Sequence, residues 1–329
     1  MDKFDWQASE SAPRYYPMRI LAGSLSYHDG SGSLYIPDGS DIDKGWGLGI
    51  SSHVTGERLK PLPNRLGISF FSYTENQFYQ GKFDLPYDKI LKLFQEGYYS
   101  PNEGKHITYH KIVTGIAPGG AVAVWLAGFD KTTEVFFGQA EKYEGEWRSI
   151  TRNTEMSREE YVRSSVEESL KTPEALEALR KNGVPIGLWA RYRTRYPWQP
   201  LFTGMTVRDG WIDEVRYFTG ELDNLKYPLE PGIAASTRPV PSLIYFISYY
   251  TPIKGRTYEL TFNEPEIFDA FKKLGNNHPP LQLEMRMTPN DAGKNVFSVW
   301  LRNAKESIEL KRTGVKIYAA NDRKVEAGK

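Results

Sequence analysis

The sequence contains no cysteine, which excludes disulfide bonds, thiolate metal sites and cysteine nucleophiles. Histidine is scarce too, and the chain holds only His28, His53, His106, His110 and His278. A zinc site needs several convergent ligands. Only His106 and His110 lie close together in the sequence, and the residues between them look like strand, which would hold the two imidazoles too far apart for one ion. We therefore expect no metal site.

Charge of one sign and long apolar runs are also missing. The 42 basic and 41 acidic residues nearly cancel, and no five like charges follow one another. Nucleic acids and anionic membrane surfaces attract proteins mainly through an excess of positive charge, so neither is expected as a partner. The longest apolar run, near Ala121–Leu126, is far shorter than the roughly 20 residues that a membrane-spanning helix needs.

The motifs of the common enzyme classes are absent as well. The fragments nearest to Gly-x-Ser-x-Gly, Ala22–Ser24 and Gly49–Ser51, lack the second glycine of a serine hydrolase. Gly45–Gly49 departs from the dinucleotide fingerprint, and no glycine loop carries a Gly-Lys-Ser/Thr ending. With 41 acidic residues, chance pairs are certain, so spacing alone assigns no glycosidase dyad. We expect no catalytic residue, no cofactor and no enzyme activity.

What the chain does have is an internal repeat. The stretch from Leu66 to Leu126 returns in weaker form between Ile244 and Leu301. The matches keep the same order, and they are Ser72-Tyr73 with Ser248-Tyr249, Ile90–Phe94 with Ile267–Phe271, and Trp125-Leu126 with Trp300-Leu301. Upstream, Ile186–Tyr192 resembles Phe4–Trp6, which places the start of the second copy near residue 185. A chain of 329 residues is long enough for two such domains.

Local patterns predict that each copy is mostly strand with one helix. Runs rich in branched and aromatic residues, such as Met18–Tyr27 and Leu66–Tyr73, predict strands. Pro86 suits the start of a helix that Gly97 ends, and Glu264–Leu274 predicts its counterpart. We therefore predict an α+β, β-rich fold of two tandem duplicated domains. Each is a mainly antiparallel sheet or sandwich with one helix, and a helical pair joins them.

The helical pair is predicted between residues 151 and 184, which belong to neither copy. Ser157 and Glu160 form the pattern of a capping box at the first helix, and Thr172 is a natural N-cap for the second. Both helices have an apolar stripe, so we expect them to pack on a domain. The predicted boundaries are a first domain at 1–150, the helical connector at 151–184 and a second domain at 185–329.

Two predicted loops, His28–Gly47 and Gly97–Lys105, combine small polar residues with aromatic ones. Exposed loops carry many binding residues, and we predict partner contacts for Tyr35, Trp46, Tyr98 and Tyr99. Trp125 and Trp300 lie inside apolar strands, which predicts core packing for both. The acidic residues of the first loop lack EF-hand spacing and favour a solvated turn over a calcium site; they are Asp38, Asp41 and Asp43.

Short motifs in the first part of the chain carry a family resemblance. They are Pro13–Pro17, Gly32–Pro37 running to Gly45–Gly47, Phe78-Tyr79 with Leu85-Pro86, Gly115–Gly120 running to Val124–Leu126, and Arg193–Trp198. Together they resemble a bacterial family known as a domain of unknown function. Its members are commonly exported lipoproteins, and many are encoded beside phospholipase effectors of type VI secretion. The family supplies no catalytic residues to assign here.

The resemblance implies a periplasmic immunity protein that binds a cognate lipase and occludes its active site or lid. Such inhibition needs only a complementary surface. Because the chain has no cysteine for a lipid anchor, we expect the anchor either to be naturally absent or to have been removed with a signal peptide. Two alternatives stay open. One is a carbohydrate-binding or cell-envelope module whose loop aromatics stack on sugars, and the other is an enzyme of an unfamiliar class.

Overall fold

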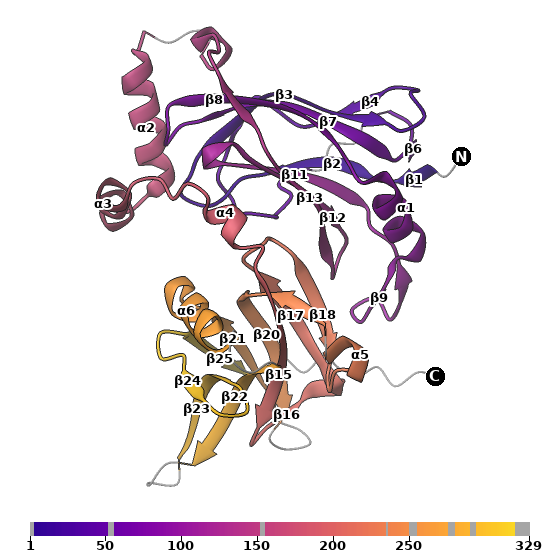
Figure 1. The fold of residues 1–329 in the computed structure, drawn as a ribbon, viewed down its shortest axis with the longest axis vertical. Helices are drawn as coiled ribbons and strands as arrows, with labels where there is room; N and C mark the ends of the chain where they lie inside the picture. Colours follow the sequence, from indigo (N-terminus) through magenta and orange to yellow (C-terminus); the bar gives the residue numbers. More distant parts are fainter. Residues whose placement is uncertain are drawn as a thin grey trace. The chain divides into compact units, whose positions relative to one another are not determined.

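The computed structural model describes residues 3–51, 56–151, 155–234, 236–249, 255–275, 280–289 and 294–319 (Figure 1). The chain divides into two compact units. Unit 1 comprises Met1–Tyr192 with Thr219–Glu221, and unit 2 comprises Arg193–Phe218 with Leu222–Lys329. Both units are built mainly from antiparallel strands with few helices, so the predicted α+β, β-rich fold is confirmed. The residues predicted to form a separate helical connector belong to unit 1.

Among the described residues, unit 1 contains two large sheets and two small pairs of strands. The first has the order β2-β11-β12-β13, with β2 at Gln7–Ser11, β11 at Lys111–Ala117, β12 at Ala121–Ala127 and β13 at Thr132–Gln139. β2 is parallel to β11, and the other pairs are antiparallel. The second has the order β14-β8-β7-β3-β4, with β3 at Met18–Tyr27, β4 at Ser33–Tyr35, β7 at Pro63–Ser72, β8 at Gln77–Asp84 and β14 at Glu141–Tyr143. The short β5 (Asp41–Ile42) pairs with β3.

The core of unit 1 lies between these sheets. Alternate residues of each strand point inward, so Ile112 and Val124 of the first sheet share one apolar cluster with Ile20 and Ile68 of the second. Helix α1 (Tyr87–Glu96) adds its buried Ile90 and Phe94 to that cluster. The helix ends at Gly97, as predicted. A side chain at Gly97 would collide with the Ile107 carbonyl, and its φ of 58° also favours glycine.

One predicted strand of unit 1 is divided in the structure. The residues between His106 and His110 were expected to be strand, but the structure has β10 at Lys105–Ile107 and β11 at Lys111–Ala117, with the chain between them outside both strands. β10 forms a small hairpin with β9 (Tyr98–Ser100). Another small pair joins β1 (Lys3–Asp5) to β6 (Leu59–Pro61).

Helices α2 (Arg158–Leu170), α3 (Pro173–Asn182) and α4 (Leu188–Arg191) complete unit 1. The capping box of Ser157 and Glu160 is present at α2, and the Thr172 side chain caps α3. α2 packs Tyr161 and Val166 on the aromatic cluster at one end of the second sheet. For α2, this contact fulfils the expectation that the helix packs on a domain rather than forms a free tether.

Unit 2 also contains two sheets. The first has the order β19-β15-β22-β23-β24, with β15 at Arg195–Thr203, β19 at Thr237–Pro239, β22 at Leu281–Pro289, β23 at Asn295–Arg302 and β24 at Ser307–Glu309. The second has the order β18-β17-β20-β21-β25, with β17 at Trp211–Tyr217, β18 at Leu222–Lys226, β20 at Pro241–Tyr249, β21 at Gly255–Thr261 and β25 at Gly314–Ala319. The short β16 (Thr206–Val207) pairs with β20. The helices are α5 (Pro231–Ala234) and α6 (Glu264–Gly275), and α6 contributes Ile267 and Phe271 to the core.

The two units repeat one topology. In each, a strand near the start of the unit lies parallel to a strand that follows the core helix, as β2 with β11 and as β15 with β22. The stacked ring pair Phe70–Tyr79 on β7 and β8 has its counterpart in Phe246–Tyr258 on β20 and β21. The internal repeat seen in the sequence is therefore a structural duplication.

The start of the second copy differs from the sequence match of Ile186–Tyr192 with Phe4–Trp6, which is wrong. Trp6 Nε1 donates a hydrogen bond to the Pro61 carbonyl at 3.3 Å, and Trp198 Nε1 donates the same bond to Pro239 at 2.9 Å. Trp198 is thus the counterpart of Trp6, while Ile186–Tyr192 lies in unit 1. A match of a few aromatic residues does not fix strand register, whereas the repeated hydrogen bond does.

Candidate functional site

Two of the four predicted contact residues are exposed. Tyr35 on β4 is 41% exposed, and Tyr99 in the hairpin of β9 and β10 is 52% exposed. They come from different parts of unit 1, since β4 belongs to the second sheet and the hairpin follows α1. Both side chains are therefore exposed enough to contact a partner, as that prediction requires.

The other two predicted contact residues are engaged inside unit 1. Trp46 packs edge-on against Trp125, with ring centroids 4.8 Å apart. Tyr98 is buried, its hydroxyl accepts a hydrogen bond from the Phe129 amide at 2.8 Å, and burial raises its pKa. The loop position of both residues suggested exposure, but their rings serve the packing of the loops onto the sheet.

The acidic residues of the loop before Trp46 also have partners within the protein. Asp41 accepts a hydrogen bond from the Tyr73 hydroxyl at 2.8 Å, and burial raises the pKa of Asp41. Asp43 accepts one from Ser169 at 2.6 Å. Burial opposes ionisation of Asp43, but the Ser169 bond and Lys44 outweigh it and lower its pKa. Within the described residues, no group of three or more histidine, aspartate or glutamate side chains is arranged to hold a metal ion.

A groove of about 650 Å³ lies on the outer face of the second sheet of unit 1. Its floor crosses β3 and β7 at small residues, and register places Ala22 opposite Ser69 and Ser24 opposite Gly67. On the neighbouring strand β8, Gln80 and Lys82 line the groove. Phe83, Gln139 and Glu141 also border it. The sheet face is hollow here because these floor residues project little or no side chain.

The same face changes character along the strands. Toward Phe71 and Phe78 it is aromatic, and α2 covers it, with the Arg158 guanidinium 5.6 Å and 5.3 Å from the two ring centroids. The groove begins where this cover ends. A Cβ built at Gly67 would meet only Ser24 Oγ, at 3.7 Å, so the groove has space above that position. In the sequence, the available signal for the groove was that small residues alternate along part of β3 and part of β7. This signal became informative only once the register of the two strands placed those residues side by side.

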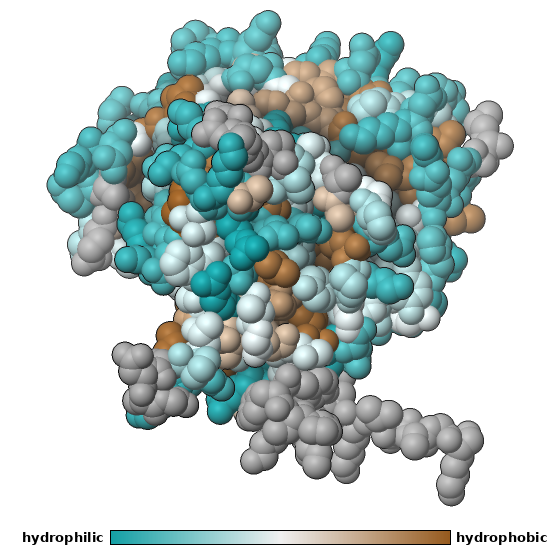
Figure 2. Space-filling view, turned by 60° about the horizontal axis from the view of Figure 1, so that its bottom comes forward, coloured by the Kyte–Doolittle hydropathy of each residue, from teal (hydrophilic) through white to brown (hydrophobic). Residues whose placement is uncertain are grey.

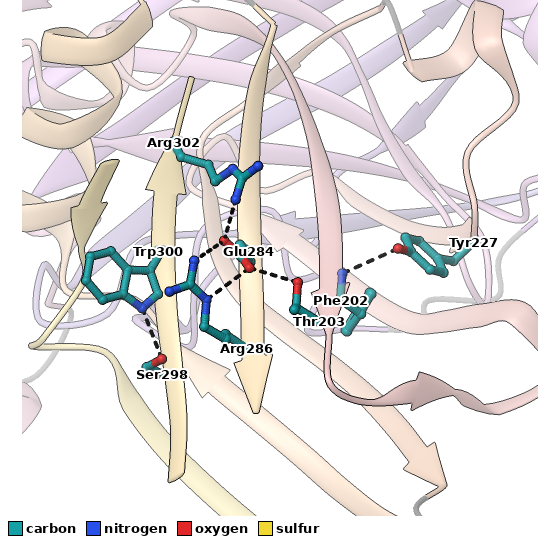
Figure 3. A network of polar contacts seen from close by, with 8 residues as sticks. All are labelled: Phe202, Thr203, Tyr227, Glu284, Arg286, Ser298, Trp300 and Arg302. Carbon is teal, nitrogen blue, oxygen red and sulfur yellow. Dashed lines mark hydrogen bonds and ion pairs between the residues drawn. The ribbon is translucent and has the colours of Figure 1, made fainter. Parts of the chain in front are cut away.

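A second polar feature lies on the outer face of the first sheet of unit 2 (Figure 3). The Glu284 carboxylate on β22 accepts hydrogen bonds from Thr203 Oγ1 at 2.8 Å, from Arg286 at 3.0 and 2.8 Å, and from Arg302 at 3.2 Å. Burial opposes ionisation of Glu284, but these donors outweigh it and lower its pKa. The Arg286 guanidinium lies 5.1 Å from the Trp300 ring centroid.

The prediction of core packing for both repeat tryptophans is correct for Trp125 and wrong for Trp300. Trp125 is fully buried, and its Nε1 donates to the Thr219 carbonyl at 3.1 Å. Trp300 is only partly buried and lies on the outer face beneath Arg286. On the strand of Trp300, one face is apolar through Phe297, Val299 and Leu301, whereas Ser298 and Arg302 share the face of Trp300. Those two polar residues were the signal that this face is not part of the core.

The surface shown in Figure 2 is mostly hydrophilic, with hydrophobic residues gathered in several separate patches. Among the described residues, none of the helices combines the length and the apolar content needed to cross a membrane.

The fold therefore defines a duplicated, β-rich protein with a groove in unit 1 and an arginine–tryptophan cluster in unit 2. Residues 1–187 match the model of a family described as protein of unknown function (DUF2931), and the chain belongs to this family. The match ends shortly before the last residue of the first stretch of unit 1, Tyr192. No curated protein and no solved structure matched the chain.

Proposed function

We propose that this protein binds and inhibits a phospholipase effector of type VI secretion, as the immunity protein of the cell that makes the effector. The family resemblance described in the sequence analysis supports the proposal, and the DUF2931 family itself has no assigned function. The family match falls within the first stretch of unit 1. Unit 1 is therefore the first place to look for the shared function.

The observation that carries the proposal is the groove on the second sheet of unit 1. Lipases commonly open and close a lid, and a protein that holds the lid or covers the active-site mouth stops turnover without any reactive group. A floor of Ala22, Ser24, Gly67 and Ser69 lets a protruding element approach the sheet backbone closely. Lys82, Gln80 and Glu141 offer charge and hydrogen bonds at its border. A contact surface of complementary shape, bordered by polar residues, is typical of protein interfaces.

The proposed site of action is the periplasm, where the protein would meet a lipase before it reached the phospholipids of its own cell. A lipid anchor on a longer precursor would hold it close to that membrane. Fractionation of cells that make the full-length precursor would test this placement. Recovery from the cytoplasm alone would contradict it.

The test uses purified protein and the phospholipase effector encoded beside its gene. Binding is measured by calorimetry, and inhibition by phospholipid hydrolysis. The variant Gly67→Phe places a ring above the groove floor, and its backbone φ is not in the left-handed region. The matched control is Gly314→Phe on β25 of unit 2, where a Cβ also has open space, with the nearest atom at 3.6 Å.

We expect the unsubstituted protein and Gly314→Phe to bind and inhibit equally. Gly67→Phe should lose affinity by about tenfold or more, which corresponds to about 1.4 kcal/mol. No binding by the unsubstituted protein to a folded, active effector would refute the proposal. Retention of the protein on envelope glycans, with no effect on the lipase, would instead support a carbohydrate-binding or cell-envelope module. If Gly67→Phe and Gly314→Phe bound the effector equally well, the interface would lie outside the groove.

A further inference from the structure

The duplication allows one sheet face to be compared in two copies. In unit 1 the outer face of the first sheet is covered by the loop Gly45–Ser51, which brings Trp46 against Trp125. Backbone bonds hold this loop to the end of β2, since the Gly45 amide donates to Ala12 at 2.9 Å and the Ile50 amide to Glu10 at 3.1 Å. The chain itself therefore occupies this face in unit 1.

The equivalent positions of unit 2 carry charged residues. Trp125 lies opposite Val113, and Trp300 lies opposite Glu284, so Val113 corresponds to Glu284. By the same register, Gly115 corresponds to Arg286 and Ala127 to Arg302. A Cβ at Gly115 would lie 2.6 Å from Trp125 Cη2 and 3.0 Å from Trp46 Cζ3, so a side chain there would crowd the loop cover. In unit 2 a guanidinium takes that place.

The arrangement places negative charge below positive charge. The Glu284 side chain is 2% exposed, whereas Arg286 is 30% and Arg302 is 40% exposed. One carboxylate is shared by two guanidiniums, so the exposed part of the cluster is cationic. Glu309 lies opposite Trp300 in register, but it is paired with Lys311 at 3.8 Å. The surface around Arg286 and Arg302 is therefore complementary to an anionic group.

The cluster is also pre-organised. Two hydrogen bonds to Glu284 and the Trp300 ring fix the Arg286 guanidinium. Among the described contacts, Arg302 uses one of its five N–H donors, in the bond to Glu284, and retains the others for a ligand. Burying the Glu284 carboxylate is costly. A sheet face that is merely exposed to water does not need a buried carboxylate. Arginine and tryptophan together are typical of the residues that dominate protein interfaces.

We propose that this face of unit 2 binds a protein segment bearing an Asp or Glu carboxylate, which lies between Arg286 and Arg302 while its apolar neighbours contact Trp300. The inference rests on the proposed function, because the partner is the phospholipase effector. A planar carboxylate matches the fork of a guanidinium, and such charge-assisted bonds are the strong ones. In this proposal the effector is bound at two places, by the groove of unit 1 and by the arginine–tryptophan cluster of unit 2.

The experiment measures effector binding by the full chain with Arg302→Gln. This variant leaves Glu284 bonded to Arg286 and Thr203, so the network stays satisfied. The matched control is Arg256→Gln, an exposed arginine on β21 in the other sheet of unit 2. We expect Arg302→Gln to weaken binding at least about tenfold and to reduce its salt dependence, while Arg256→Gln changes neither. Trp300→Leu should weaken binding without changing the salt dependence.

Unchanged unfolding midpoints establish that the variants fold. Equal affinity of Arg302→Gln, Trp300→Leu and the unsubstituted protein would overturn the anchor and leave the proposed function standing. Failure of the unsubstituted protein to bind would overturn both. If Arg302→Gln lost binding to vesicles of phosphatidylglycerol but kept its affinity for the effector, the face would recognise lipid phosphate and the carboxylate anchor would be wrong.

Discussion

The packing of Trp46 and Trp125 on β11 makes a sharp prediction about Gly115. A Cβ there would lie 2.6 Å from Trp125 Cη2 and 3.0 Å from Trp46 Cζ3, closer than side chains pack. Trp125 cannot move away easily, because it is fully buried and hydrogen-bonded to Thr219. Gly115→Ala therefore overpacks this face of unit 1.

The magnitude follows from two opposing effects. Overpacking a tight core costs roughly 1–3 kcal/mol. Replacing glycine by alanine at an unstrained position gains about 0.4–1 kcal/mol by restricting the unfolded chain. Gly115→Ala should therefore lower the free energy of unfolding by about 1–2 kcal/mol. Gly67→Ala is the control, because its Cβ would meet no atom closer than 3.7 Å, and it should be neutral or stabilising by less than about 1 kcal/mol.

The assay is urea unfolding, followed by circular dichroism and fluorescence so that separate transitions of the two units are resolved. A double-mutant cycle identifies the cause. Phenylalanine lacks the second ring of Trp125, so Gly115→Ala with Trp125→Phe should lose less stability than the two changes added, by about 1 kcal/mol. If Gly115→Ala is as stable as Gly67→Ala, or if the two changes simply add, the packing argument is refuted.

Two further predictions concern unit 2 and the repeat. Trp6→Phe and Trp198→Phe each remove one buried hydrogen bond, to Pro61 and to Pro239, and leave part of a fully buried ring site empty. Each should therefore cost more in urea unfolding than the roughly 1 kcal/mol of the bond alone, and a cost for only one would contradict their equivalence. Because the folded-state pKa of Glu284 is lowered, its contribution to stability is fully present above the ordinary glutamate pKa of about 4.3 and is lost as pH falls through the lower value. Urea unfolding across this range should show a steeper acid loss for the unsubstituted protein than for Glu284→Gln, and parallel curves would contradict it.

Much of the local structure was predictable because it depends on neighbouring residues. The helix between Pro86 and Gly97 and the capping box of Ser157 and Glu160 follow from backbone rules that act within a few residues. The repeat was also visible, since residues facing a core are restricted in type and shape. Phe70 and Phe246 fill the same place in each unit.

The surfaces were less predictable, because they depend on partners distant in the sequence. Trp46 lies in a loop rich in glycine, and nothing nearby indicates that it packs on Trp125. Trp300 matches Trp125 in the sequence, but its burial depends on whether a loop covers the strand. The groove needs the register of β3 with β7, which brings Ser24 opposite Gly67.

The comparison of the units shows where this duplicated fold can acquire different functions. Inward positions kept their chemistry, as with Trp6 and Trp198, because a change there leaves a cavity or an unpaired carbonyl acceptor. The outward position of Gly115 carries arginine in the other unit. Among the described residues, a guanidinium rather than a loop lies over Trp300, and such a face accepts any side chain that water or a partner can satisfy. On the outer face of unit 2, a buried glutamate holds two arginines in place. A face that only contacts water would not need that arrangement. That difference between the copies is the reason to look for a partner on unit 2 as well as in the groove of unit 1.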